Sequence, residues 1–179
     1  ERSGRHPVEV IVDRMLESRG RELFNAWFYN RNLASLPAFL GLDEVCPGLG
    51  DAGAHAGQIC DADSPTHYLA YWCRKRKIVD LPGAVHRLTS RPASVLGLVD
   101  RGTVEVGRFA DLNVFDPGSL QAGYPEYVHD FPNGKGRLRV GASGYAATIV
   151  NGVVVTRQGR NTGLRPGRVL REFERSRPA

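Results

Sequence analysis

The chain has 179 residues, of which 41% are hydrophobic and 24% charged, a composition typical of a soluble globular protein of one domain or two small ones. No apolar run is long enough to cross a membrane, so we expect no membrane association. The formal net charge is +5, and much of the excess lies in residues 74–77 and 165–177. Because no basic stretch alternates with aromatic residues, we interpret these as a solvated helix end and tail, and expect no nucleic-acid partner.

The first half of the chain has the pattern of an α/β protein. Apolar residues at positions 8, 11, 12, 15 and 16 predict an amphipathic helix over residues 7–20. Residues 23–28 form a nearly continuous apolar run, typical of a parallel strand covered on both faces. A helical stretch at 33–42, interrupted by Pro37, and a short strand at 45–50 come next. This order of elements predicts a parallel sheet with crossover connections.

Three further helices are predicted after residue 60. Ser64 is the expected cap of the first, with Pro65 at its first position. Its buried stripe is predicted to consist of Tyr68, Leu69, Trp72 and Cys73. The other two helices are expected at about residues 82–89 and 92–97.

The three cysteines, Cys46, Cys60 and Cys73, are odd in number and have no CxxC spacing. This pattern argues against a disulfide framework or a structural zinc site, and it favours a reducing cytoplasm. We therefore expect the cysteines to be buried as small hydrophobic residues. The chain starts at Glu1 without an initiator Met or a signal segment, so we expect a start created by processing, cloning or a cut.

The pattern changes near residue 99, where short β-like runs replace the helical period. Runs at 102–107 and 110–115 predict strands, and we place a domain boundary at residue 98. Residues 118–137 are polar and rich in Gly, Pro and Tyr, which predicts a long loop that covers a neighbouring surface or the site.

The strongest local prediction is a β-hairpin near the end of the chain. Residues 145–150 and 153–156 are rich in β-branched side chains, and the pair Asn151-Gly152 between them is the pair that a type I′ turn favours.

The candidate catalytic stretch is Gly48-Leu49-Gly50-Asp51-Ala52-Gly53-Ala54-His55. A carboxylate on a glycine-rich turn just after a short apolar run is typical of the mouth of a parallel-strand barrel, where it would act as a general acid or base. The alternative is that Asp51 caps a turn or a helix and that the glycines only shape the loop.

Three blocks of residues 21–171 resemble the amidohydrolase superfamily, most closely its D-aminoacylase branch. They are Gly50-Asp51-Ala52-Gly53-Ala54-His55, residues 88–117 with the core Gly107-Arg108-Phe109-Ala110-Asp111-Leu112, and residues 150–163 with Asn151-Gly152. The first block is similar to the motif after the eighth barrel strand of that branch. The second is similar to the superfamily's passage from barrel to sandwich, and the third to its terminal hairpin.

The resemblance implies a zinc-dependent hydrolase built on a TIM-type barrel with a β-sandwich. By its match to the motif, Asp51 would accept a proton from a metal-activated water and return it to the leaving nitrogen, and it is a candidate metal ligand. His55 would contact the substrate; its alternative is a loop histidine bonded to a neighbouring carbonyl. Tyr29 and Asn30, at the end of the strand at 23–28, are candidate substrate-binding residues, or they close the barrel rim.

The chain also departs from the family pattern. Members take their other metal ligands, a His-x-His pair or its remnant among them, from earlier barrel strands, and the five histidines here have no such spacing. One carboxylate cannot hold a zinc ion that takes three or four protein ligands. We therefore expect this chain alone to bind no zinc and to be inactive. Asp111 belongs to the superfamily signature, but its place at a strand start predicts a structural hydrogen bond.

The predicted fold class is α/β. Residues 1–98 are expected to be the last β/α units of an incomplete amidohydrolase barrel, and residues 99–179 the carboxyl-terminal part of a β-sandwich. The predicted function of the parent enzyme is hydrolysis of the amide of N-acyl-D-amino acids or a related C–N bond other than a peptide. The alternative is a non-catalytic accessory or interaction piece with the family fold. Open strand edges predict self-association, or association with the missing amino-terminal part.

Overall fold

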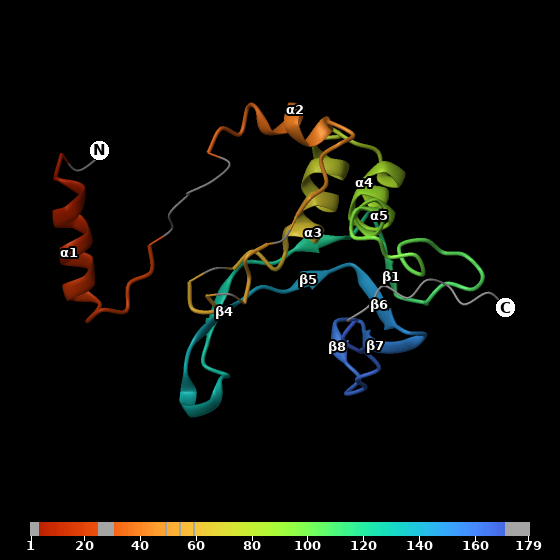
Figure 1. The fold of residues 1–179 in the computed structure, drawn as a ribbon. Helices are drawn as coiled ribbons and strands as arrows, with labels where there is room; N and C mark the ends of the chain where they lie inside the picture. The colour runs from red at the N-terminus through yellow and green to blue at the C-terminus, as the bar shows by residue number, and fades with distance from the viewer. Residues whose placement is uncertain (1–3, 25–30, 49, 54, 59, 171–179) are drawn as a thin grey trace. The chain divides into compact units, whose positions relative to one another are not determined.

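The computed structural model describes residues 4–24, 31–48, 50–53, 55–58 and 60–170 (Figure 1). The chain divides into two compact units, residues 1–36 and 37–179. The predicted boundary at residue 98 remains a prediction, because it concerns the family's barrel and sandwich rather than these two units.

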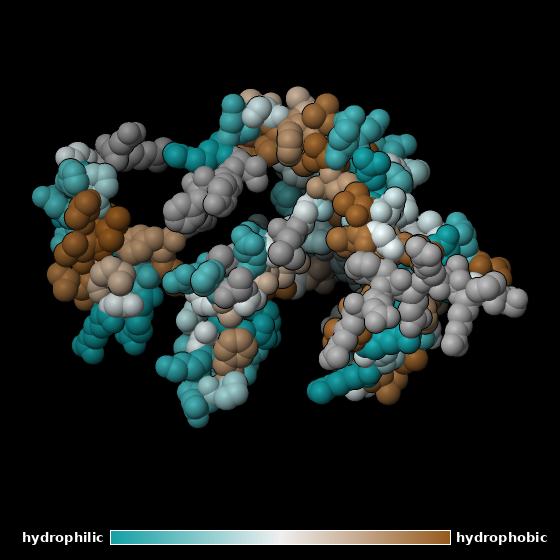
Figure 2. Space-filling view, viewed as in Figure 1, coloured by the Kyte–Doolittle hydropathy of each residue, from teal (hydrophilic) through white to brown (hydrophobic). Residues whose placement is uncertain are grey.

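The first unit contains the predicted amphipathic helix, α1 (Pro7–Glu17). Pro7 occupies its first turn, where a missing N–H costs nothing, and the side chain of His6 accepts a hydrogen bond from the N–H of Val8 at 3.3 Å. Gly20, with φ of +76°, lies just beyond the helix end. Figure 2 shows the hydrophobic side chains of α1 gathered together, as the spacing of its apolar residues requires.

The two predicted parallel strands are not part of the described structure. Most of the strand at 23–28 lies outside the described residues. The prediction of a strand at 45–50 is wrong, since residues 45–48 and 50 have no regular secondary structure. A strand needs a hydrogen-bonded neighbour, and every strand pairing among the described residues is antiparallel and involves residues after 111.

Helical segments make up most of the regular structure before residue 96 in the second unit. They are α2 (Leu36–Gly41), which begins in the first unit, α3 (Ser64–His67), the π-helix η1 (Tyr68–Lys75), α4 (Leu81–Leu88) and α5 (Ser90–Val95). The sequence predicts that Pro37 interrupts a helical stretch at 33–42. This is wrong, because Pro37 lies in the first turn of α2. Ser64 is the first residue of α3, and Asp63 precedes it as the cap residue without a side-chain hydrogen bond, so the predicted Ser64 cap is wrong. The side chain of Asp80 caps α4 by accepting the N–H of Gly83 at 2.9 Å.

The core of the second unit lies where η1 meets the neighbouring helices and β-segments. The predicted buried stripe of η1 is confirmed, because all four of its residues are buried, with exposed fractions of 3–8%. Across the described part of the chain, the buried hydrophobic residues are Tyr68, Leu69, Trp72, Cys73, Ala84, Ala93 and Leu120.

The main sheet has the strand order β1-β6-β7-β8, and all its neighbours are antiparallel. Its strands are β1 (Leu112–Phe115), β6 (Tyr145–Val150), β7 (Val153–Arg157) and β8 (Arg160–Asn161). The predicted hairpin is confirmed: Asn151 and Gly152 both have positive φ, +48° and +78°, as the two central residues of a type I′ turn must. Figure 1 shows β6 and β7 side by side in blue.

Two predictions for the β-rich half are wrong. Residues 102–107 form no strand, because Gly102 and Gly107 have φ of +91° and +87°, which a strand does not accommodate. The predicted loop at 118–137 instead contains β2 (Gln121–Ala122), β3 (Glu126–Val128) and the 3₁₀ turn η2 (Pro132–Gly134). Its strands have antiparallel partners later in the chain, β5 (Ala142–Ser143) for β2 and β4 (Arg137–Arg139) for β3.

Within the described residues, no helix combines the length and the apolar character needed to cross a membrane.

Candidate active site

The candidate site is a turn-rich segment that we call the Asp51 loop, residues 50–58. Its first residue, Gly50, lies so close to the returning chain that a Cβ there would stand 2.4 Å from the carbonyl oxygen of Asp61. Gly53 has φ of +92°, which favours glycine. Gly50 is therefore required by close packing against Asp61, and Gly53 by its backbone conformation.

Asp51 and His55 are both exposed on this loop. Among the described residues, neither side chain makes a hydrogen bond or an ion pair. Asp51 thus accepts no described backbone N–H, so the turn-capping interpretation finds no support there. The carbonyl of His55 accepts the N–H of Gln58 at 2.7 Å, which closes the turn without using the imidazole. A carboxylate and an imidazole are left available to an external group.

The other two candidate substrate-binding residues, Tyr29 and Asn30, lie outside the described residues. In the described part of the chain, His, Cys, Asp and Glu side chains form no group of three or more that could hold a metal ion. A zinc site with three or four protein ligands therefore does not fit these residues.

The cysteines only partly follow the prediction. All three are free, and Cys73 is buried, but Cys46 and Cys60 are half-exposed. Burial raises the pKa of the Cys60 thiol, and the carboxylates of Asp63 and Asp61 raise it further. Burial likewise raises the pKa of Cys73, with a smaller effect from Asp80. Both thiols are held in their protonated, unreactive form.

Asp111 has the structural role predicted for it. One carboxylate oxygen accepts the backbone N–H of Asn151 at 2.7 Å, and the other pairs with Arg101. The carbonyl of Ala110 accepts the N–H of Gly152 at 2.9 Å. The superfamily signature therefore holds the hairpin turn onto the start of β1, and it does not belong to the Asp51 loop.

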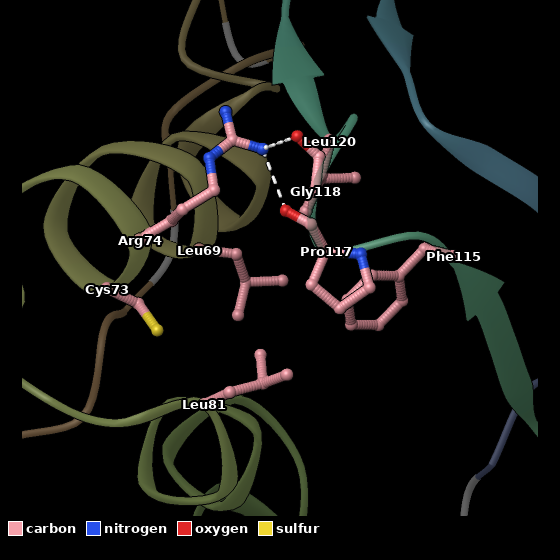
Figure 3. Close-up of a pocket in the computed structure, with 8 residues that line it drawn as sticks. All are labelled: Leu69, Cys73, Arg74, Leu81, Phe115, Pro117, Gly118 and Leu120. Atoms are coloured by element: carbon pink, nitrogen blue, oxygen red, sulfur yellow. Dashed lines mark hydrogen bonds between the residues drawn. The ribbon is translucent and has the colours of Figure 1, made fainter.

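A pocket that the sequence did not indicate lies between η1, α4 and the segment after β1 (Figure 3). Its volume is about 320 Å³, at the small end of the range for ligand pockets. Its lining is mostly apolar and consists of Leu69, Cys73, Arg74, Leu81, Phe115, Pro117, Gly118 and Leu120.

Arg74 closes one side of this pocket. Its Nη1 donates to the carbonyl oxygens of Pro117 at 2.7 Å and Gly118 at 2.8 Å, as the dashed lines in Figure 3 show. Residues 74–77 are exposed at the end of η1, as expected for a solvated helix end, and Arg74 in addition binds these two carbonyls. Nothing in the sequence distinguishes Arg74 from the other cations of the run, because its partners lie more than 40 residues away.

Comparisons with known proteins agree with the motifs. The profile described as "Amidohydrolase family" matches residues 9–156. The chain is 34% identical over 106 residues to N-acyl-D-glutamate deacylase from Alcaligenes xylosoxydans xylosoxydans, covering 59% of this chain and 20% of that protein. It is 34% identical over 102 residues to D-aminoacylase from the same organism, covering 57% and 19%.

Among solved structures, a D-aminoacylase mutant in complex with copper chloride matches with a TM-score of 0.49 and 31% sequence identity. The match covers 60% of this chain and 21% of that one. The chain spans about a fifth of the length of the curated relatives it matches.

The predicted resemblance to the superfamily and to its D-aminoacylase branch is thus confirmed. The matched residues include the Asp51 loop, the signature around Asp111 and both strands of the β6–β7 hairpin up to Thr156. Because the family match covers well over half of the sequence, this chain belongs to the amidohydrolase family.

Proposed function

We propose that Asp51 is the general acid and base of a metal-dependent hydrolase that cleaves the amide of N-acyl-D-amino acids or a related C–N bond. The observation that carries the proposal is the family match through the Asp51 loop, together with relatives named as deacylases of N-acyl-D-amino acids. The mixed helices and sheets of the chain fit the α/β class of the family.

The chemistry assigned to Asp51 depends on its surroundings. The carboxylate is exposed and has no described partner, so both oxygens can accept a proton from a water and return it to a leaving nitrogen. His55, exposed on the same loop, binds the substrate carboxylate in this proposal. Tyr29 and Asn30 are further candidate residues for binding the substrate.

The metal needs ligands from outside the described residues, because these contain no group able to hold one. A D-aminoacylase has been solved in complex with copper chloride, which supports metal dependence in that relative, and zinc remains our prediction for the full-length gene product. We further propose that residues 1–98 complete the family's barrel and that residues 99–179 contribute sandwich strands.

The first experiment tests this chain alone. Incubated with zinc and N-acetyl-D-glutamate, the purified 179-residue chain releases no D-glutamate, because the described residues contain no group of three or more side chains able to hold a metal ion. Amine release is measured with a fluorogenic reagent, and N-acetyl-L-glutamate is the stereochemical control. Release that stops when the metal is chelated would contradict the expected inactivity.

The second experiment tests the role of Asp51 in the full-length gene product. Asp51→Asn keeps the shape of the side chain and removes its basicity, so kcat for deacylation falls by about 10²–10⁴-fold. Asp61→Asn is the matched control, because Asp61 is exposed and its carboxylate makes no hydrogen bond among the described residues; this variant keeps its activity. If Asp51→Asn is as active as the wild type, the assignment fails.

A further inference from the structure

The segment β3–η2–β4, residues 126–139, is a braced hairpin. Arg137 donates to both carboxylate oxygens of Asp130, at 2.6 and 2.7 Å, and Arg139 pairs with Glu126 across the strands at 2.9 Å. The Nδ1 of His129 lies 3.0 Å from the carbonyl oxygen of Gly134, within hydrogen-bond distance. These contacts give the hairpin its own fixed shape, so it can act as a support for other residues.

The outer edge of this hairpin binds the Asp51 loop. In an antiparallel pair, alternate residues direct their N–H and C=O groups away from the partner strand. Leu138 of β4, which is paired with Tyr127 of β3, donates its N–H to the carbonyl oxygen of Ala56 at 2.8 Å. Ala56 comes directly after His55, so this hydrogen bond holds the backbone next to the imidazole.

Tyr127 makes a second connection between the same two segments. Its ring lies over Gly136, where a Cβ would stand 2.2 Å from Cε1, so only glycine leaves room for it. A Cβ added at Gly57 would lie 3.9 Å from its hydroxyl oxygen, so the hydroxyl lies beside the side of Gly57 that carries no side chain. The tyrosine therefore extends from the hairpin to the residue after Ala56.

The candidate catalytic residue Asp51 and the candidate substrate-binding residue His55 thus lie between two anchors. Before Asp51, Gly50 is packed against the carbonyl of Asp61; after His55, Ala56 is hydrogen-bonded to Leu138 of the hairpin. A loop restrained at both ends has lost much of its conformational entropy before a substrate binds. Such restraint matters for catalysis, because a displacement of about 1 Å can lower a rate by about 10²-fold.

We propose that the β3–β4 hairpin positions the Asp51 loop and that Tyr127 is the positioning residue that holds the two together. The functional meaning of this assignment rests on the proposed role of Asp51, whereas the physical coupling does not. In this assignment Tyr127 acts through Gly136 and Gly57, which its ring and hydroxyl lie beside, while Leu138 of the same hairpin binds Ala56.

The test is amide hydrogen exchange of the 179-residue chain, observed by NMR. In Tyr127→Ala, the amides of Gln58 and Leu138 exchange about tenfold faster than in the wild type, because their acceptors lie in the loop that is released. The ring resonances of His55 shift as well. Tyr127→Phe keeps the ring over Gly136 but lacks the hydroxyl near Gly57, so its exchange rates lie between those of the wild type and Tyr127→Ala.

Two controls separate positioning from general destabilisation. Tyr124→Ala removes a tyrosine that lies two residues before β3, is 89% exposed and has no described partner, and it leaves Gln58 and His55 unchanged. The amides of α4 and β6 keep wild-type exchange rates in every variant. Gly136→Ala moves the Tyr127 ring without removing it, and it gives the same pattern should Tyr127→Ala fail to fold.

Wild-type exchange at Gln58 and Leu138 in a folded Tyr127→Ala or Gly136→Ala variant would overturn the proposal. The same holds if β6 and α4 open together with the loop in both variants, because the effect would then be global. No substrate is present in these measurements, so an inactive enzyme would refute the proposed function and leave this result standing.

Discussion

At the scale of single residues, Asp111 joins three segments of the chain. Its two oxygens bind the Arg101 guanidinium and the N–H of Asn151. The Arg101 side chain is only 12% exposed and also lies 4.3 Å from the ring centroid of Phe109. A carboxylate that neutralises a nearly buried cation is costly to remove, because the cation then loses a partner.

We predict that Asp111→Ala lowers the free energy of unfolding by about 2 kcal/mol, since it removes a charge-assisted pair and a backbone hydrogen bond. Urea denaturation monitored by circular dichroism measures the change. Glu105→Ala is the control, because its ion pair with Arg108 is exposed and is worth about 0–1 kcal/mol. Equal effects of the two substitutions would contradict the structural role of Asp111.

A second residue-scale prediction concerns pH. The hydrogen bond and charge of Arg137 hold the pKa of Asp130 below its ordinary value of 3.8. Because the folded pKa is lowered, the pair stabilises the hairpin above about pH 3.8, and this contribution is lost as the pH falls through the lower folded value.

The Nε–H resonance of Arg137 therefore stays constant from pH 7 to about 4 and moves only below that range. A pH titration by ¹⁵N NMR records it. In Asp130→Asn the transition disappears. A transition centred above 3.8 in the wild type would show that the ion pair does not form in solution.

At the scale of elements, the β6–β7 hairpin depends on its turn. Gly152 has φ of +78° and open space where a Cβ would be, so a side chain there meets no clash but must adopt an unfavourable backbone conformation. Asn151 tolerates its own positive φ better than most residues do.

We therefore predict that Gly152→Ala destabilises the chain by about 1 kcal/mol. Gly141→Ala is the matched control: it also has open space around the new Cβ but no positive φ, and it changes stability by less than about 0.5 kcal/mol. Thermal and urea denaturation compare the two variants. If Gly152→Ala leaves the stability of the chain unchanged, the turn has relaxed to a different type.

At the scale of the whole molecule, apolar side chains are left uncovered near the end of the helical segments. Val95, the last residue of α5, is 73% exposed, and in the segment after α5 Val104 is 85% exposed and Val106 fully exposed. Exposed apolar residues that gather into a patch usually mark an interaction surface. We propose that copies of this chain cover these valines for one another, in line with the self-association expected from the sequence.

Light scattering should accordingly give a mass that rises with concentration above the 19.6 kDa of one chain. Replacing Val104 and Val106 by Lys lowers the mass at a given concentration, because charge opposes burial of the surface. Lysine at the polar, exposed positions Asp61 and Gln121, which are not next to these valines in the sequence, is the control. A single-chain mass at every concentration would rule out self-association.

The accuracy of the sequence predictions differs between the elements for a physical reason. Helix α1, the buried stripe of η1 and the Asn151-Gly152 turn were all predictable, because each depends on residues that are near in the sequence. The strand predicted at 102–107 failed, since alternation alone does not reveal that glycines at both ends adopt positive φ.

The candidate site divides in the same way. The family could be inferred from the resemblance of three sequence blocks to known members, and the hydrogen bond of Asp111 from its place at a strand start. The pocket at Arg74 could not be inferred, because half of its lining comes from residues 115–120, part of which the sequence predicts to be a loop.

The sequence by itself therefore determined the family, the local helices and the hairpin turn, all of which are written in residues a few positions apart. Only the tertiary structure decided which side chains serve as connections between segments. Asp111 meets Asn151 40 residues away, Arg74 meets Pro117 43 residues away, and the Asp51 loop meets β4 through Ala56 and Leu138. Such pairings depend on how the chain folds back on itself, and local propensity carries no information about them.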